Sequence, residues 1–83
     1  MDLIRIHPKD NVAVAVKALA PGQALASGVT AVVTRQPIAA GHKIALVPIA
    51  AGENVVKYGY PIGTAQVDIA AGDWVHTHNL KTG

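Results

Sequence analysis

The sequence repeats one short phrase four times, and this repeat limits the possible folds more than any other feature. Each copy runs from an apolar residue through small residues and a glycine to a second apolar residue. The copies are Leu19–Leu25, Ile38–Ile44, Ile49–Val55 and Ile69–Val75. Each glycine stands where one apolar run ends and the next begins, which suits a turn with positive φ. Because the spacings between copies alternate between long and short, the phrases predict similar corners in one small fold rather than a solenoid of fixed period.

Residues between the corners have the period of β-strands. Val12, Val14 and Val16 recur at every second position, and this period of two is the clearest strand signal in the sequence. A helix capped by Asp10 is the competing interpretation, but alternating β-branched residues favour a strand. Thr and Val are also concentrated in 29–35, and Gly and Pro interrupt the runs. We therefore predict one all-β domain over residues 1–83, with five to seven short strands in a sandwich or partly open barrel.

Composition excludes several classes of protein. Hydrophobic residues make up 51% of the chain, yet it has no Phe and no Cys, so disulfides and cysteine metal sites are ruled out. The amino terminus does not resemble a signal peptide, and no apolar run approaches the roughly 18 residues of a membrane span. Basic residues are scattered and aromatic residues are few, which argues against nucleic-acid binding. We expect a soluble, cytoplasmic protein without a membrane or nucleic-acid partner.

Two histidines near the carboxyl end form the most informative polar cluster. If 76–79 is extended, His76 and His78 point to the same side, with Cα atoms roughly 6.5 to 7 Å apart. Two imidazoles so placed can share a metal ion, with His42 as the best third ligand because it follows an equivalent corner. They can equally contact a substrate or remain surface histidines.

Other polar residues cluster beside glycines. His42 and Lys43 directly follow a turn glycine and suit a carboxylate ligand, or both are simply solvated. Lys57 and Tyr58 precede Gly59, where they form either a rim against a partner or an ordinary hairpin turn. The chain offers no paired carboxylates or activated nucleophile, so an independent enzyme is a poor interpretation.

Taken together, four stretches resemble a known family. They are 10–15 (DNVAVA), 40–46 (AGHKIAL), 56–63 (VKYGYPIG) and 69–79 (IAAGDWVHTHN). In their order and spacing they look like the SAF domain of the altronate and galactarate dehydratases. They also resemble the small subunit of relatives that include sulfolactate sulfo-lyase.

The resemblance implies a β-clip fold of the SAF type and a role beside a large catalytic dehydratase subunit. The substrate would be a sugar acid, the cofactor a divalent cation such as Fe2+, and the chain a possible homo-oligomer. The candidate catalytic residues are His42, His76 and His78, of which His76 and His78 are also candidate metal ligands. The candidate substrate-binding residues are Lys43, Lys57, Tyr58 and Asn79. Trp74 and Tyr60 lie where we expect the family to vary.

These observations predict the small subunit of a sugar-acid dehydratase, a hydro-lyase that is not active alone. The alternative is a binding or assembly module of a multisubunit lyase, with its histidines on a solvated face. A third interpretation is a carbohydrate- or ice-binding β-clip protein, which would bind its ligand without a partner.

Overall fold

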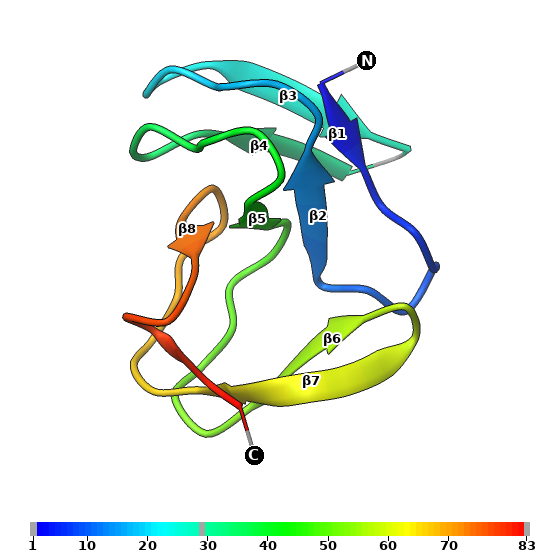
Figure 1. The fold of residues 1–83 in the computed structure, drawn as a ribbon, viewed down its shortest axis with the longest axis vertical. Coiled ribbons are helices and arrows are strands. Elements are labelled where there is room, and N and C mark those ends of the chain that lie inside the picture. The colour runs from blue at the N-terminus through cyan, green and yellow to red at the C-terminus, as the bar shows by residue number, and fades with distance from the viewer. Residues whose placement is uncertain (1, 29, 83) are drawn as a thin grey trace.

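The fold was analysed in a computed structural model, which describes residues 2–28 and 30–82. Nine short strands make up its regular structure (Figure 1). They are β1 (Leu3–Ile4), β2 (Val12–Ala15), β3 (Ala24–Ser27), β4 (Thr30–Val33), β5 (Lys43–Ala45), β6 (Asn54–Lys57), β7 (Tyr60–Ala65), β8 (Trp74–Val75) and β9 (Leu80–Lys81). The all-β prediction is confirmed, although the strands are shorter and more numerous than expected. The strand expected over 29–35 is β4, and Val29 lies outside the described residues.

Strands far apart in the sequence pair to form three small sheets. The central sheet has the order β1-β2-β5-β8, with antiparallel neighbours. The hairpin β3-β4 lies above it in Figure 1, and the sheet β6-β7-β9 lies below. Within the described residues, no helix is long or apolar enough to cross a membrane. The fold is therefore a three-layer arrangement with the central sheet in the middle.

Alternation along the central strands separates two hydrophobic cores. In β5, Ile44 packs into a core shared with the β3-β4 hairpin, and Ala45 packs into a core shared with β6 and β7. In β2, Ala13 packs into the first of these cores and Val12 into the second. Because successive side chains in a strand point to opposite faces, one strand serves both cores. The abundance of Ala and Val fits this requirement, since both faces must approach closely packed neighbours.

The four repeated phrases form four equivalent corners, as the sequence predicted. Their glycines have φ values of 76°, 84°, 86° and 90° for Gly22, Gly41, Gly52 and Gly72. At each corner the glycine N–H donates to a carbonyl on another segment, and the N–H of that same partner donates back to the residue after the glycine. The four partners are Thr34, Ala15, Ala65 and Ala45. The first two corners are joined by a bridge between Leu19 and Ile38, and the last two by one between Ile49 and Ile69.

In three of these corners, a side chain of the corner accepts a hydrogen bond from the corner's own backbone. The residue after the glycine accepts the backbone N–H three positions earlier: Gln23 from Ala20 at 3.2 Å, Glu53 from Ala50 at 2.7 Å and Asp73 from Ala70 at 2.7 Å. At the remaining corner this position is His42. Among the described residues, His42 makes no equivalent bond to Ala39 through its side chain. The exception makes His42 a candidate for a role other than folding.

Asp10 and Asn11 fasten the β6-β7 hairpin to the amino-terminal segment through their side chains. The Asp10 carboxylate accepts the N–H of Gly59 at 2.8 Å and of His7 at 3.0 Å. Asn11 binds the backbone of β6 through both ends of its amide. These bonds hold Tyr58 at a φ of 59°, a value rare for a residue with a bulky side chain.

We expect Asp10→Asn to weaken the domain and to flatten its acid dependence. Burial alone would raise the pKa of Asp10, but hydrogen bonds from the N–H groups of Gly59, His7 and Tyr58 lower it below the ordinary 3.8. A lowered folded-state pKa contributes stability that is present above the unfolded value and is lost as the pH falls through the folded value. Losing one charged acceptor costs about 1.5 to 3 kcal/mol near neutral pH. Urea unfolding of both proteins from pH 7 to pH 2 measures this, and parallel curves would contradict it.

Candidate functional site

Four aromatic side chains gather at one end of the central sheet. We call them the ring cluster: His42, Trp74, His76 and His78. The imidazole of His76 stacks on that of His42, with ring centroids 4.7 Å apart and planes 26° apart. His76 also stacks on the indole of Trp74 at 5.3 Å and 12°, and His78 lies against the indole at 4.8 Å. The three histidines singled out in the sequence are thus brought together by a tryptophan.

Pairing of β5 with β8 places the ring cluster. In this register Ile44 lies opposite Trp74, so His42, two residues from Ile44, leaves the same face as Trp74 and His76. Trp74 donates its indole N–H to Nδ1 of His42 at 3.1 Å. The ring cluster therefore depends on contacts between residues more than thirty positions apart.

The expected extended conformation of 76–79 is wrong. Regular strand ends at Val75, and the next residues form a turn in which the N–H groups of Asn79 and Leu80 both reach the carbonyl of His76. His76 and His78 nevertheless remain near each other because both contact the Trp74 ring, not because the backbone alternates. His78 is exposed, whereas His42 and His76 are half-buried.

Asn79 is used to build this turn. Its Oδ1 accepts the N–H of His76 at 3.0 Å, and its Nδ2 donates to the carbonyl of Trp74 at 2.8 Å. The side chain is 5% exposed. Its predicted substrate-binding role stays a prediction, and the contacts seen here are those of a residue that positions His76.

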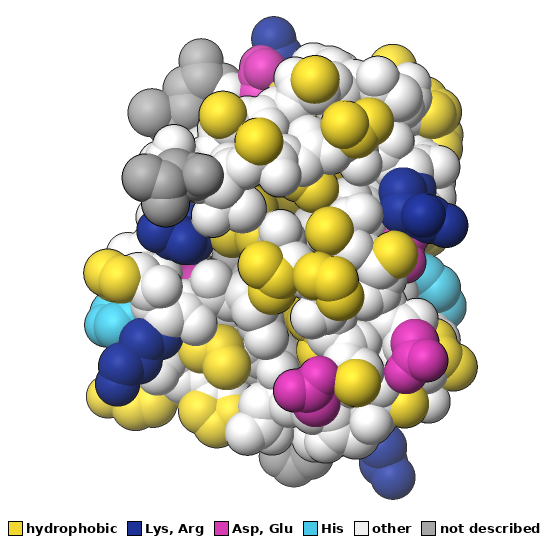
Figure 2. Space-filling view, turned by 180° about the vertical axis from the view of Figure 1, so that it is seen from behind, with side chains coloured by type: hydrophobic (Ala, Val, Ile, Leu, Met, Phe, Trp, Pro, Cys, Tyr) yellow, Lys and Arg dark blue, Asp and Glu magenta, His cyan; other side chains and the backbone are white. Residues whose placement is uncertain are grey.

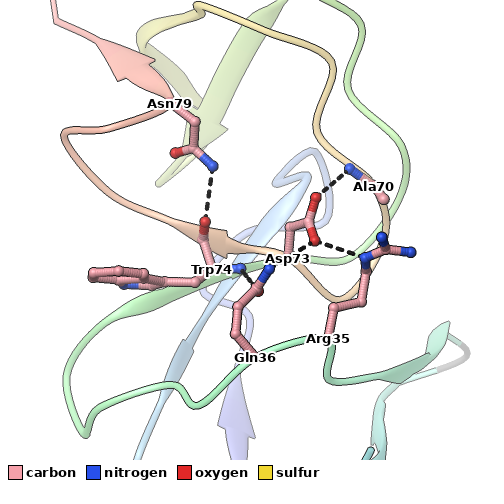
Figure 3. A network of polar contacts seen from close by, with 6 residues as sticks. All are labelled: Arg35, Gln36, Ala70, Asp73, Trp74 and Asn79. Carbon is pink, nitrogen blue, oxygen red and sulfur yellow. Dashed lines mark hydrogen bonds and ion pairs between the residues drawn. The ribbon is translucent and has the colours of Figure 1, made fainter. Parts of the chain in front are cut away.

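Figure 3 shows how the backbone of Trp74 is held. Gln36 accepts the Trp74 N–H at 2.7 Å and donates to Asp73, which also forms an ion pair with Arg35 at 2.9 Å. Together with Asn79, these side chains occupy the outer edge of β8. The indole projects away from this network. Trp74 is therefore fixed at its backbone while its ring is presented to the histidines.

Lys43, Lys57 and Tyr58 form a second group on the other side of the strand. Lys43 follows His42 in an extended segment, so the two side chains leave opposite faces of the sheet. Partial burial lowers the pKa of Lys43, the positive charge of Lys57 lowers it further, and Tyr58 partly offsets both effects. The Lys57 Nζ lies 4.7 Å from the centre of the Tyr58 ring. The described residues provide no acidic partner for either ammonium group, which suits an anionic ligand.

The two groups lie within electrostatic range of each other. Burial is the largest cause of a lowered pKa for His76, followed by the positive charges of His42, Lys43 and His78. The ring cluster thus contains three of the seven candidate site residues, and the second group contains three more on the opposite face of the strand. The seventh, Asn79, supports the turn that carries His76. Sequence reasoning missed Trp74 as a member. The available signal was that a single tryptophan stands two residues before His76.

We expect the imidazole of His76 to titrate below its ordinary pKa of 6.5. Neighbouring positive charges raise the free energy of the protonated ring, so a lower pH is needed to protonate it. NMR titration of the His76 ring protons measures the midpoint, which should move upward in Lys43→Ala. Lys17→Ala serves as control because Lys17 pairs with Asp2. An unchanged midpoint in Lys43→Ala would contradict the proposed proximity.

The described residues do not form a metal site by themselves. No group of three His, Asp or Glu side chains among residues 2–28 and 30–82 is arranged to hold a metal ion. Nδ1 of His42 already accepts a hydrogen bond, which removes one of its two possible ligand atoms. A metal bound by His76 and His78 would need further ligands from outside this chain.

Comparison with known proteins identifies the family. The whole chain, residues 1–83, matches the family described as the altronate/galactarate dehydratase SAF domain, and the chain belongs to this family. It is 54% identical over 82 residues to the altronate dehydratase of Escherichia coli and 42% identical over 79 residues to that of Bacillus subtilis. These alignments cover 99% and 95% of this chain but only 17% and 16% of the relatives. The chain thus spans about a sixth of their length.

A shorter relative also matches. The alpha subunit of (2R)-sulfolactate sulfo-lyase from Paracoccus pantotrophus is 50% identical over 42 residues, which is 51% of this chain and 63% of that subunit. The predicted family is therefore confirmed.

Proposed function

We propose that this chain is the small SAF-domain subunit of a sugar-acid dehydratase of the altronate/galactarate type, and that a separate large subunit completes its active site. The family match and the names of the relatives support the hydro-lyase assignment. The name of the sulfo-lyase relative, a subunit alpha, supports the division between subunits.

One observation carries the proposal: three histidines lie around Trp74, and the positive charge of Lys43 acts on one of them, His76. Histidines supply proton transfer near neutral pH, and ammonium groups bind carboxylates. Partly exposed histidines that lie against one another are difficult to explain by folding alone. A shared pocket at this end of the central sheet would use them.

The chemistry of dehydration fits these residue types. Loss of water from a hydroxy acid requires removal of a proton beside the carboxylate, stabilisation of the enediolate, and an acid that assists the departing hydroxide. Lys43 and Lys57 would bind the substrate carboxylate with Tyr58 beside them, and His76 or His78 would donate the proton to the departing hydroxide. The divalent cation implied by the family, expected to be Fe2+, would supply charge stabilisation. Among residues 2–28 and 30–82, no three His, Asp or Glu side chains are arranged to hold the cation, so we assign it to the large subunit.

A graft into a relative tests the proposal. The segment of the Escherichia coli altronate dehydratase that matches this chain is replaced by this chain, and altronate dehydration is measured. We expect the graft to be active, and His76→Ala and His78→Ala to reduce turnover. Tyr60→Ala is the matched control because Tyr60 is 73% exposed and lies outside the ring cluster. If the graft were active and neither His76→Ala nor His78→Ala reduced its turnover, a catalytic contribution of these histidines would be refuted.

A purely binding or assembly module is the second candidate, favoured by the exposure of Tyr58 and His78. In that case Tyr58→Ala or Ile62→Ala would weaken association with the large subunit, while His76→Ala and His78→Ala would leave turnover intact. Analytical ultracentrifugation of the mixed subunits, combined with the same activity assay, separates the two candidates.

A further inference from the structure

We infer that Trp74 is a positioning residue that holds His42 in the tautomer with its proton on Nε2. His42 then offers a neutral N–H donor to an oxygen of the ligand. The identity of this ligand as a sugar acid rests on the proposed function, but the tautomer does not.

The first evidence is the direction of the hydrogen bond. The indole N–H can only donate, and it lies 3.1 Å from Nδ1 of His42. Nδ1 must therefore carry a lone pair, and the proton of the neutral ring lies on Nε2. The tautomer is assigned from this bond.

The second evidence is the comparison between corners. At three corners, a side-chain oxygen accepts a backbone N–H of the same corner; the residues are Gln23, Glu53 and Asp73. His42 occupies the same position but turns its Nδ1 to Trp74 instead. The corner at Gly41 still has its backbone bonds to Ala15. The side chain at this corner is thus available for another purpose, and Trp74 determines its orientation.

The third evidence is the rigidity of Trp74 itself. Its backbone N–H and carbonyl are bound by the side chains of Gln36 and Asn79, and His76 and His78 lie against its ring. A donor held in this way loses little conformational freedom when it orients His42.

The chemical consequence is specific. A neutral imidazole with Nε2–H stabilises the negative charge that develops on a carboxylate oxygen when the neighbouring proton leaves. The proton stays on Nε2, so His42 acts by hydrogen bonding and not by proton transfer. Proton transfer to the leaving hydroxyl is left to His76 or His78.

Nitrogen-15 NMR of the labelled chain tests the tautomer without any partner. We expect Nε2 of His42 to carry the proton, Nδ1 to be bare, and the Trp74 indole N–H to be protected from exchange. A proton on Nδ1 in the wild-type chain would overturn the inference, and this result requires no variant to fold.

Trp74→Phe in the active graft tests the consequence. Phe keeps a ring for His76 and His78 but has no N–H, so we expect the Nδ1 resonance of His42 to shift. We also expect kcat to fall about tenfold with KM little changed, a change that corresponds to about 1.4 kcal/mol in the activation free energy. Tyr60→Phe is the control for an aromatic change outside the ring cluster. If both kcat and the His42 resonance were unchanged in Trp74→Phe, the positioning role would be overturned. An inactive wild-type graft would instead count against the proposed function, and the tautomer result would still hold.

Discussion

Replacing Gly72 with alanine is expected to destabilise the domain strongly. Gly72 has a φ of 90°, and a Cβ added there would collide with the carbonyl oxygen of Val33. The backbone of Gly72 cannot easily move away, because its N–H donates to the carbonyl of Ala45 and its carbonyl accepts the N–H of Arg35. Positive φ costs a residue with a side chain roughly 1 to 2 kcal/mol and overpacking roughly 1 to 3 kcal/mol, which gives a loss of about 2 to 5 kcal/mol. Urea unfolding followed by circular dichroism measures it.

Gly52→Ala is the matched control for this change. Gly52 occupies an equivalent corner with a φ of 86°, but nothing lies within 4 Å of an added Cβ. Only the cost of positive φ applies at Gly52, so we expect the free energy of unfolding to fall by roughly 1 to 2 kcal/mol. Equal losses for the two variants would show that the close approach of Gly72 to Val33 does not matter. A small domain with a total stability of about 4 to 12 kcal/mol makes the difference easy to measure.

His42→Asp is expected to remove activity while keeping the fold. Aspartate at this corner can accept the N–H of Ala39, as Asp73 accepts that of Ala70 at 2.7 Å. We expect the free energy of unfolding to stay the same or to rise by up to about 1 kcal/mol. Turnover of the active graft should fall by about 10²-fold or more, the range for loss of a charge-stabilising donor. Denaturation of the isolated chain and turnover of the graft are measured on the same variant.

The reciprocal change is the control. Glu53→His places an imidazole at an equivalent corner and removes the bond to the Ala50 N–H at 2.7 Å. We expect it to lose about 0.5 to 1.5 kcal/mol of stability and to leave turnover unchanged. If Glu53→His reduced turnover as much as His42→Asp, the corner geometry and not the imidazole would explain the loss.

Much of the fold was predictable because its signals are local. The turn glycines and the alternating valines depend on φ preference and on strand periodicity. The glycines were placed correctly, and so was the strand, although it ends at Ala15 and leaves Val16 42% exposed. The number of strands was underestimated because the corners shorten each strand to a few residues. Pro61 and Gly63 both lie inside β7, opposite a register shift between Val55 and Val56 of β6.

The site was only partly predictable because it depends on strand register. The sequence identified His42, His76 and His78 by residue type, but the pairing of β5 with β8 determines which of them meet Trp74. The turn at 76–79 results from the two bonds of Asn79 to the backbone, which periodicity does not reveal. The residue after each glycine was a usable signal: three of the four can accept a hydrogen bond through oxygen, and the fourth is His42.

The back of the molecule gives no comparable signal. Figure 2 shows hydrophobic side chains spread over this face, with acidic and basic groups around its margins. Two open hollows of the domain are lined by Arg35, Ala71 and residues of β3 and β4, and by Ile49, Ile69 and their corner neighbours. Nothing in the described residues indicates what would cover these hollows.

The most direct test of the account is the rate at which the grafted dehydratase removes water from altronate after all three imidazoles are deleted. The triple variant His42→Ala, His76→Ala and His78→Ala should remain folded, because none of these side chains lies in either hydrophobic core. If the three histidines take part in catalysis, turnover should fall at least about 10²-fold, as expected when acid–base groups are lost. A rate within twofold of the unmodified graft would contradict it.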